Sequence, residues 1–189
     1  TGVQTCALPI FPATTDTVAT LSNVGVYNSF KNRIINGAMM IDQRNAGASV
    51  TPSNTYTLDR WQGQNSQTSK YTVQQSSTAP TGFKTSLLVT SSSAYSVGSG
   101  DYFFLNQPIE GFNTADLGFG ASGASTITIS FWVRSSLTGT FGGSIRNYNV
   151  DRSYPFSYTI SAANTWEQKS VTIAGDTSGT DRKSTRLNS

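Results

Sequence analysis

Apolar and polar residues alternate along several short segments, most regularly at Ser125–Arg134. Every second residue of this segment is apolar, namely Ile127, Ile129, Phe131 and Val133. The residues between them are Thr128, Ser130, Trp132 and Arg134. Because successive side chains of a strand point to opposite faces, this pattern predicts a half-buried β-strand with the first set facing the core.

Further short strands are predicted along the chain, separated by residues that favour turns. They cover 70–75, 86–90, 102–105, 154–162 and 166–173. The expected inward side chains are Tyr71, Val73, Phe156, Tyr158, Ile160, Val171 and Ile173. The continuous apolar run at 102–105 predicts a strand covered on both faces, and the Gly-rich segment 112–124 predicts a loop. Many short strands without a helix of ordinary length are typical of a β-sandwich.

The segment Asn32–Trp61 predicts the start of this sandwich. Apolar residues at 34–35 and 38–41 flank Asn36-Gly37, which indicates a strand with a tight local irregularity. A second strand is expected at 55–64. The residues between, 44–54, have the Asn, Gly, Ser and Pro content of a loop.

The two ends of the chain correspond to opposite strands of one DNA segment. One permitted set of codons for residues 1–10 is ACT GGA GTT CAG ACG TGT GCT CTT CCG ATC, and its reverse complement translates as DRKSTRLNS, the sequence of residues 181–189. This DNA resembles a sequencing-library adapter, so we expect a translated metagenomic fragment that lacks native residues at both ends. The alternative is that residues 1–10 form a native apolar N-terminus.

We therefore divide the chain into four segments. Residues 1–10 and 181–189 are expected to be adapter-derived, 11–31 a linker or the end of a shaft, and 32–180 an incomplete β-sandwich module. Without the adapter-derived segments, 10 basic and 9 acidic residues of the original 13 and 10 remain, so the net charge falls from +3 to +1. This charge gives no support to nucleic-acid binding.

Composition favours a β-rich, turn-rich protein of extracellular type. Charged residues make up 12% of the chain and aromatic residues 11%, and there are 17 glycines. Cys6, the single cysteine, lies in the first adapter-derived segment, so a disulfide framework is excluded. No apolar run approaches the ~20 residues that span a bilayer, and we expect a soluble chain without membrane insertion.

Three motifs carry a family resemblance. NRIINGAMMIDQRNAG followed by YTLDRW, then FWVRSSLTGTFGGSIRN, and finally SYPFSYTISAANTWEQKSVTIAGDTSGT resemble the jelly-roll module of tail-fibre and related virion proteins of tailed bacteriophages. They are also similar to carbohydrate-binding-module β-sandwiches of the galactose-binding type. The resemblance covers 32–180 and implies an all-β antiparallel jelly roll that ends before its sheet is complete, leaving an exposed strand edge.

The resemblance also implies a setting for the module. Tail-fibre proteins are virion structural proteins that act in host recognition, which implies a location in the virion, other tail proteins as partners and a homotrimer. Some related sandwiches hold a structural calcium ion through oxygen ligands. Ala38 stands here where many relatives have an acidic or amide residue, so we expect no metal and no cofactor.

Enzymatic chemistry finds little support in these residues. Histidine is absent from the chain, which removes the usual general base and the commonest zinc ligand. No GxxxxGK[ST] phosphate-binding motif is present. A glycosidase would need two carboxylates across a cleft, and the sequence gives no way to pair the candidates, which are Asp42, Asp59, Asp101, Glu110, Asp116, Asp151 and Glu167. We expect no enzyme, and keep a polysaccharide-degrading tail enzyme as the remote alternative.

Glycan binding is the function that the residues favour. Sugar rings pack on flat aromatic side chains, while their hydroxyls need amide, carboxylate or guanidinium partners. Candidate ligand-binding residues are Trp132, on the polar face of its strand, and an aromatic and polar cluster expected in a loop: Asn147, Tyr148, Asp151, Arg152 and Tyr154. The alternative is structural, with Trp132 under a loop or in a virion interface and the tyrosines packed in turns. On that alternative the chain is a purely structural virion domain without a ligand.

Four other residues are interpreted as structural braces. In Asp59-Arg60-Trp61 we expect the arginine to stack on the ring or bond the carboxylate. Trp166 leads a core strand, and its counterpart in the resembling family is structural.

Overall fold

The computed structural model describes residues 31–178. The chain divides into two units between Asn32 and Arg33, so nearly all described residues belong to the second unit. The expected adapter-derived segments and all of the expected linker except Lys31 lie outside the described residues. Among the residues described, no helix is long and apolar enough to cross a membrane.

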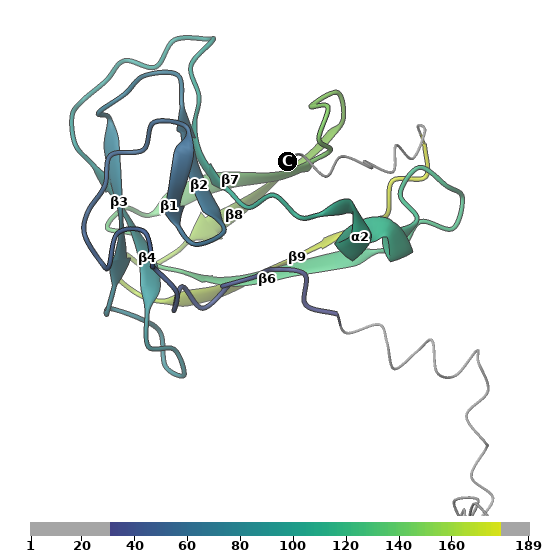
Figure 1. The fold of residues 1–189 in the computed structure, drawn as a ribbon, viewed down its shortest axis with the longest axis horizontal. Helices are drawn as coiled ribbons and strands as arrows, with labels where there is room; N and C mark the ends of the chain where they lie inside the picture. Colours follow the sequence, from purple (N-terminus) through teal and green to yellow (C-terminus); the bar gives the residue numbers. More distant parts are fainter. Residues whose placement is uncertain (1–30, 179–189) are drawn as a thin grey trace, which may run out of the picture. The chain divides into compact units, whose positions relative to one another are not determined.

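The second unit is an all-β fold, which confirms the predicted class. Its strands form four small antiparallel sheets (Figure 1). One sheet has the order β1-β2-β5, from Thr55–Leu58, Trp61–Asn65 and Phe103–Asn106. The other three pair β3 (Tyr71–Ser76) with β4 (Ser86–Ser91), β6 (Ile127–Val133) with β9 (Glu167–Ile173), and β7 (Gly139–Arg146) with β8 (Ser153–Ile160).

The alternation predicted for 125–134 is confirmed in β6. Burial alternates along the strand, with the apolar residues half-buried and Thr128, Ser130 and Trp132 exposed. The ring of Phe131 lies 5.0 Å from that of Tyr158 on β8, with the planes at 77°. Phe156, Tyr158 and Ile160 are likewise the more buried residues of β8. The apolar faces of the β6–β9 and β7–β8 sheets therefore meet.

A second apolar cluster lies among the first five strands. Leu58, Tyr71 and Val73 form its buried centre, with exposed fractions of 1%, 8% and 0%. Trp61, Phe103 and Leu105 are among the residues packed against it. The three-stranded sheet and the β3–β4 sheet therefore share one core.

Two predictions for the segment 32–64 are wrong. Residues 35–38 form a turn rather than a strand, and Asn36 has a left-handed φ of 55°. The Asn36 side chain stabilises this turn, because its amide donates to the carbonyls of Ile41 and Asp59 and its Oδ1 accepts from the Ile41 N–H. The strand expected at 55–64 is instead the β1–β2 hairpin, which reverses at Asp59-Arg60.

The structure also contains elements that the sequence pattern did not predict. Strand β7 runs through the Gly-rich segment 139–146, and the loop expected at 112–124 contains two short helical turns, α2 (Gly111–Thr114) and η1 (Ala115–Leu117). Strand β5 is half-buried along its length, whereas the preceding Tyr102 is 46% exposed.

Candidate functional site

Three of the predicted glycan residues, Asn147, Asp151 and Arg152, bond to one another in the loop that joins β7 and β8. The Asn147 side-chain amide donates to the Asp151 carboxylate, and its Oδ1 accepts from the Arg152 N–H at 3.2 Å. The backbone N–H of Asn147 donates to the Arg152 carbonyl at 3.0 Å. These polar groups therefore close the hairpin loop.

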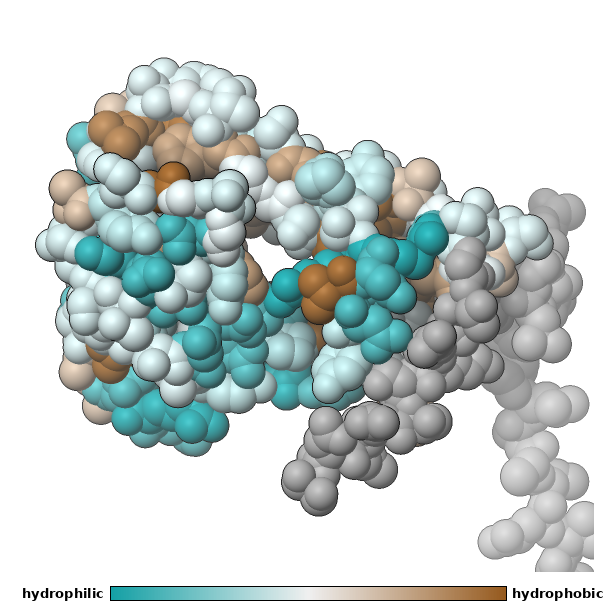
Figure 2. All heavy atoms as spheres, turned by 90° about the horizontal axis from the view of Figure 1, so that it is seen from above, coloured by the Kyte–Doolittle hydropathy of each residue, from teal (hydrophilic) through white to brown (hydrophobic). Residues whose placement is uncertain are grey.

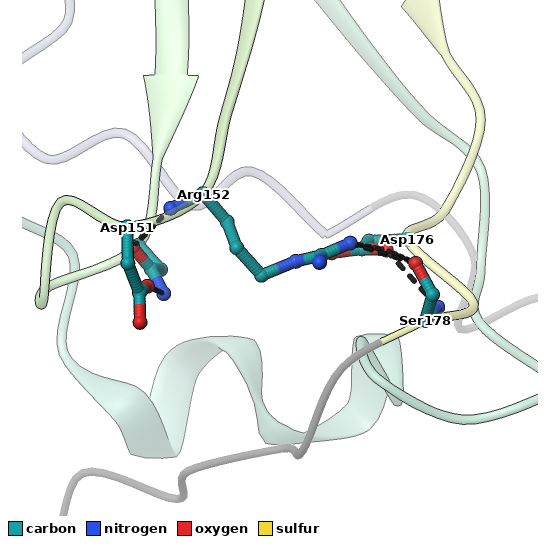
Figure 3. Close-up of polar contacts among 5 residues, drawn as sticks. Asp151, Arg152, Asp176 and Ser178 are labelled. Atoms are coloured by element: carbon teal, nitrogen blue, oxygen red, sulfur yellow. Dashed lines mark hydrogen bonds and ion pairs between the residues drawn. The ribbon is translucent and has the colours of Figure 1, made fainter.

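Arg152 also links this hairpin to the segment after β9. Its Nε and Nη2 donate to the two carboxylate oxygens of Asp176, at 2.6 and 2.5 Å, and Nη2 donates to Ser178 Oγ at 2.8 Å (Figure 3). The Arg152 hydrogen bond, followed by the Ser178 backbone N–H, lowers the pKa of the Asp176 carboxyl to about 2. A guanidinium held by both oxygens of one carboxylate has fewer donors left for a ligand.

The three predicted aromatic residues do not share one face. Trp132 is 40% exposed and lies on the outer face of β6, opposite the face on which Phe131 contacts Tyr158. Tyr154 is 47% exposed. It shares the inner face of β8 with Phe156 and Tyr158, because residues two apart along a strand point to the same side. Tyr148, at 72% exposed, lies in the hairpin loop. The structure therefore does not gather them into one platform.

The expected brace residues hold the first hairpin through other partners than those expected. Asp59 accepts the Gln43 N–H at 2.7 Å, and Trp61 Nε1 donates to the Asn36 carbonyl at 3.2 Å. Arg60 forms an ion pair with Glu110 at 2.5 Å, rather than the expected bond to Asp59. Trp166 is half-buried directly before β9.

A hollow lies at a different place in the fold. An open hollow of about 430 Å³ is lined by residues from three parts of the chain: Gln64, Tyr102, Phe104, Arg146 and Val150. In the space-filling view an opening interrupts the surface, with polar and apolar residues side by side at its margin (Figure 2). A concave site that combines apolar surface with a few polar groups is the usual form of a small-ligand site.

The register of the β1-β2-β5 sheet explains the lining. Gln64 pairs with Phe104 and Gln62 with Asn106, so these four side chains share one face. The other face carries Trp61, Phe103 and Leu105, which pack against the Leu58–Tyr71–Val73 cluster. One face of the sheet therefore builds the core, and the opposite face supplies the hollow.

Two aromatic rings and a guanidinium lie together in the hollow. The rings of Tyr102 and Phe104 are 5.6 Å apart and tilted by 37°. The Arg146 guanidinium, at the end of β7, lies 4.9 Å from the centre of the Phe104 ring. This contact brings a cation to the negative face of an aromatic ring. The guanidinium therefore lies beside the two rings, which together form an aromatic platform.

The carboxylates considered for a hydrolase are all bonded to neighbouring residues. Each accepts a hydrogen bond or an ion pair from a residue nearby, as shown for Asp42, Asp59, Asp101, Glu110, Asp116, Asp151 and Glu167. None of these seven lines the hollow. Within residues 31–178 no group of three or more His, Cys, Asp or Glu side chains is arranged to hold a metal ion.

Sequence patterns did not identify the residues of the hollow because they are distant along the chain. Gln64, Phe104 and Arg146 come together only through the β2–β5 pairing and the position of β7. The run at 102–105 carried a partial signal, since side chains at alternate positions of a strand share a face. Comparisons with protein-family models, curated proteins and solved structures found no match to this chain.

Proposed function

We propose that this chain is a non-enzymatic module of a bacteriophage virion, from a tail fibre or appendage, and that it binds host-surface glycans. The observation that carries the binding function is the hollow, where the Tyr102 and Phe104 rings lie beside Gln64 and Arg146. Aromatic rings offer a flat apolar surface to the C–H face of a sugar. Amide and guanidinium groups supply the directional partners that hydroxyls need.

The virion setting rests on the sequence resemblance, and so does the finer fold that we propose, a jelly-roll β-sandwich. The contact between Phe131 and Tyr158 supports a sandwich, because it joins the inner faces of two sheets. The homotrimer, the tail-protein partners and the virion location are proposed with it.

The second candidate is a structural or assembly domain of the virion without ligand. Large exposed apolar side chains are the observation that favours it, such as Val97 and Leu137, which are 66% and 68% exposed. Side chains of this kind mark a protein interface where they form a contiguous patch. On this alternative the hollow would have no glycan ligand.

Retention of the full chain on a panel of immobilised bacterial-surface glycans tests the proposal. We expect retention that Tyr102→Ala removes, because this side chain is 46% exposed and contributes a ring to the platform. Phe112→Ala is the matched control, since Phe112 is 87% exposed on α2 and should leave retention unchanged. Circular dichroism of each variant verifies the fold.

The same panel separates the alternatives. If Trp132→Ala or Tyr148→Ala abolishes retention while Tyr102→Ala does not, the glycan site lies on the residues first expected rather than in the hollow. No retention on any glycan contradicts the binding function and favours the structural domain. Release of reducing sugar ends would instead indicate the polysaccharide-degrading enzyme.

A further inference from the structure

We infer that the hollow selects an acidic saccharide, one whose sugar carries a carboxylate or a sulfate, and this inference rests on the proposed glycan-binding function. The described lining contains one formally charged side chain, the guanidinium of Arg146, and no carboxylate. An anionic group entering the hollow therefore meets a positive charge and no negative charge among these lining residues.

Arg146 differs from the arginines that are neutralised by an acid. Within the described part of the chain, Arg33, Arg60 and Arg152 are paired with Asp116, Glu110 and Asp176. The contact found for the Arg146 side chain is instead the face of Phe104, 4.9 Å from the ring centre. A cation–π contact leaves most of the N–H donors of a guanidinium available, so they can bind the two oxygens of an anionic group.

The neighbouring groups suit the remainder of a sugar. The Tyr102 ring lies 5.6 Å from the Phe104 ring and extends the apolar surface beside it. The side-chain amide of Gln64 donates to the Gln62 side chain at 3.3 Å. The side-chain oxygen of Gln64 can therefore accept a hydrogen bond from a sugar hydroxyl. An acidic sugar can therefore place its ring on the aromatic platform and its anionic oxygens on Arg146.

Matched pairs of oligosaccharides test the inference by isothermal titration of the full chain. Oligogalacturonate and oligoglucuronate are each compared with their methyl esters, and a sulfated galactan oligosaccharide with its desulfated form. We expect the acid to bind about tenfold or more tightly than its neutral partner in at least one pair, because charge-assisted bidentate bonds are about twice as strong as neutral ones. The advantage should shrink in added salt. The pair that shows it distinguishes a carboxylate from a sulfate ligand.

Variants assign the preference to its residue. Arg146→Gln should bring the acid down to about the affinity of its neutral partner, and it should weaken the neutral form less than the acid, because the glutamine amide can still bond a hydroxyl but carries no charge. Arg134→Gln is the control, since Arg134 is another exposed arginine and donates to the Asn164 carbonyl away from the hollow. It should keep the preference. Arg146→Lys should retain part of it, because the charge stays and the planar fork is lost.

Two results overturn the inference while leaving glycan binding intact. These are equal affinity for acid and neutral forms in every pair, and a preference that survives Arg146→Gln. Absence of binding to all oligosaccharides, acidic and neutral, overturns the proposed function as well. The three outcomes are distinguishable within one set of titrations.

Discussion

Replacing Leu58 with alanine tests the core that supports the hollow. Leu58 lies at the end of β1 and is 1% exposed, in contact with the cluster of Tyr71 and Val73. The sheet that packs against this cluster on one face supplies Gln64 and Phe104 on the other. Loss of packing beneath the sheet should therefore destabilise the domain.

The expected loss can be worked out from the atoms removed. Leucine to alanine deletes three carbon atoms, and at about 0.8 kcal/mol for each buried methylene the lost transfer free energy is about 2.4 kcal/mol. The cavity left in the cluster adds to this, which gives about 3–4 kcal/mol, within the ~2–5 kcal/mol observed for such changes. With a urea dependence of about 1–3 kcal/mol per molar, the unfolding midpoint should fall by roughly 1–4 M.

Urea unfolding of the full chain, followed by tryptophan fluorescence, measures this shift. Trp61 packs against the cluster and makes the signal sensitive to it. Leu137→Ala is the control, because Leu137 is 68% exposed and its loss should cost less than about 0.5 kcal/mol. If Leu58→Ala fails to fold, Leu58→Met should still unfold cooperatively, about 1.5 kcal/mol or less below the parent. A midpoint for Leu58→Ala equal to that of Leu137→Ala refutes the reasoning.

Two other changes test the packing and the electrostatics of this unit. Gly63→Ala should lower the urea midpoint, because the added Cβ would lie 2.5 Å from the buried Pro52 Cβ. Gly123→Ala, with nothing within 4 Å of its added Cβ, should leave the midpoint nearly unchanged, and equal shifts would contradict the close approach. Asp176→Asn should flatten the acid dependence of stability. The Asp176 carboxyl has its pKa lowered from 3.8 to about 2 by Arg152, so its contribution is present above pH 3.8 and is lost as pH falls toward 2. Midpoints measured at pH 5, 3 and 2 that fall equally steeply in parent and variant would contradict this.

Period-2 alternation was sufficient to predict β6, because burial on one face selects for it directly. Ile127 to Val133 repeat the pattern over seven residues, and the structure buries the predicted face. Strand β7 was not recognised. Its Gly142 and Gly143 lower strand propensity, and Gly143 leaves space for Phe156, since an added Cβ would lie 2.4 Å from the present position of that ring. Because of this close packing, a glycine stands where a β-branched or aromatic residue would have indicated a strand.

The first hairpin was missed for a different physical reason. Tight β-hairpins usually carry glycine where φ is positive, and the segment Thr55–Asn65 offers none at its reversal. Arg60 occupies that position with φ 75°. Its side chain donates to the Pro108 carbonyl and to Glu110. Contacts about 50 residues away along the chain therefore hold a conformation that local propensity disfavours.

The same distinction between local and long-range contacts applies to the candidate binding residues. Asn147, Asp151 and Arg152 lie close together in sequence, and their side chains are used to close the loop and to hold Asp176. A ligand that recruited them would have to break these bonds. Arg146 precedes the same loop by one residue, but its contact is a ring on β5. Its in-plane donors face no acid among the described residues of the hollow, so a ligand there can gain hydrogen bonds without displacing an ion pair.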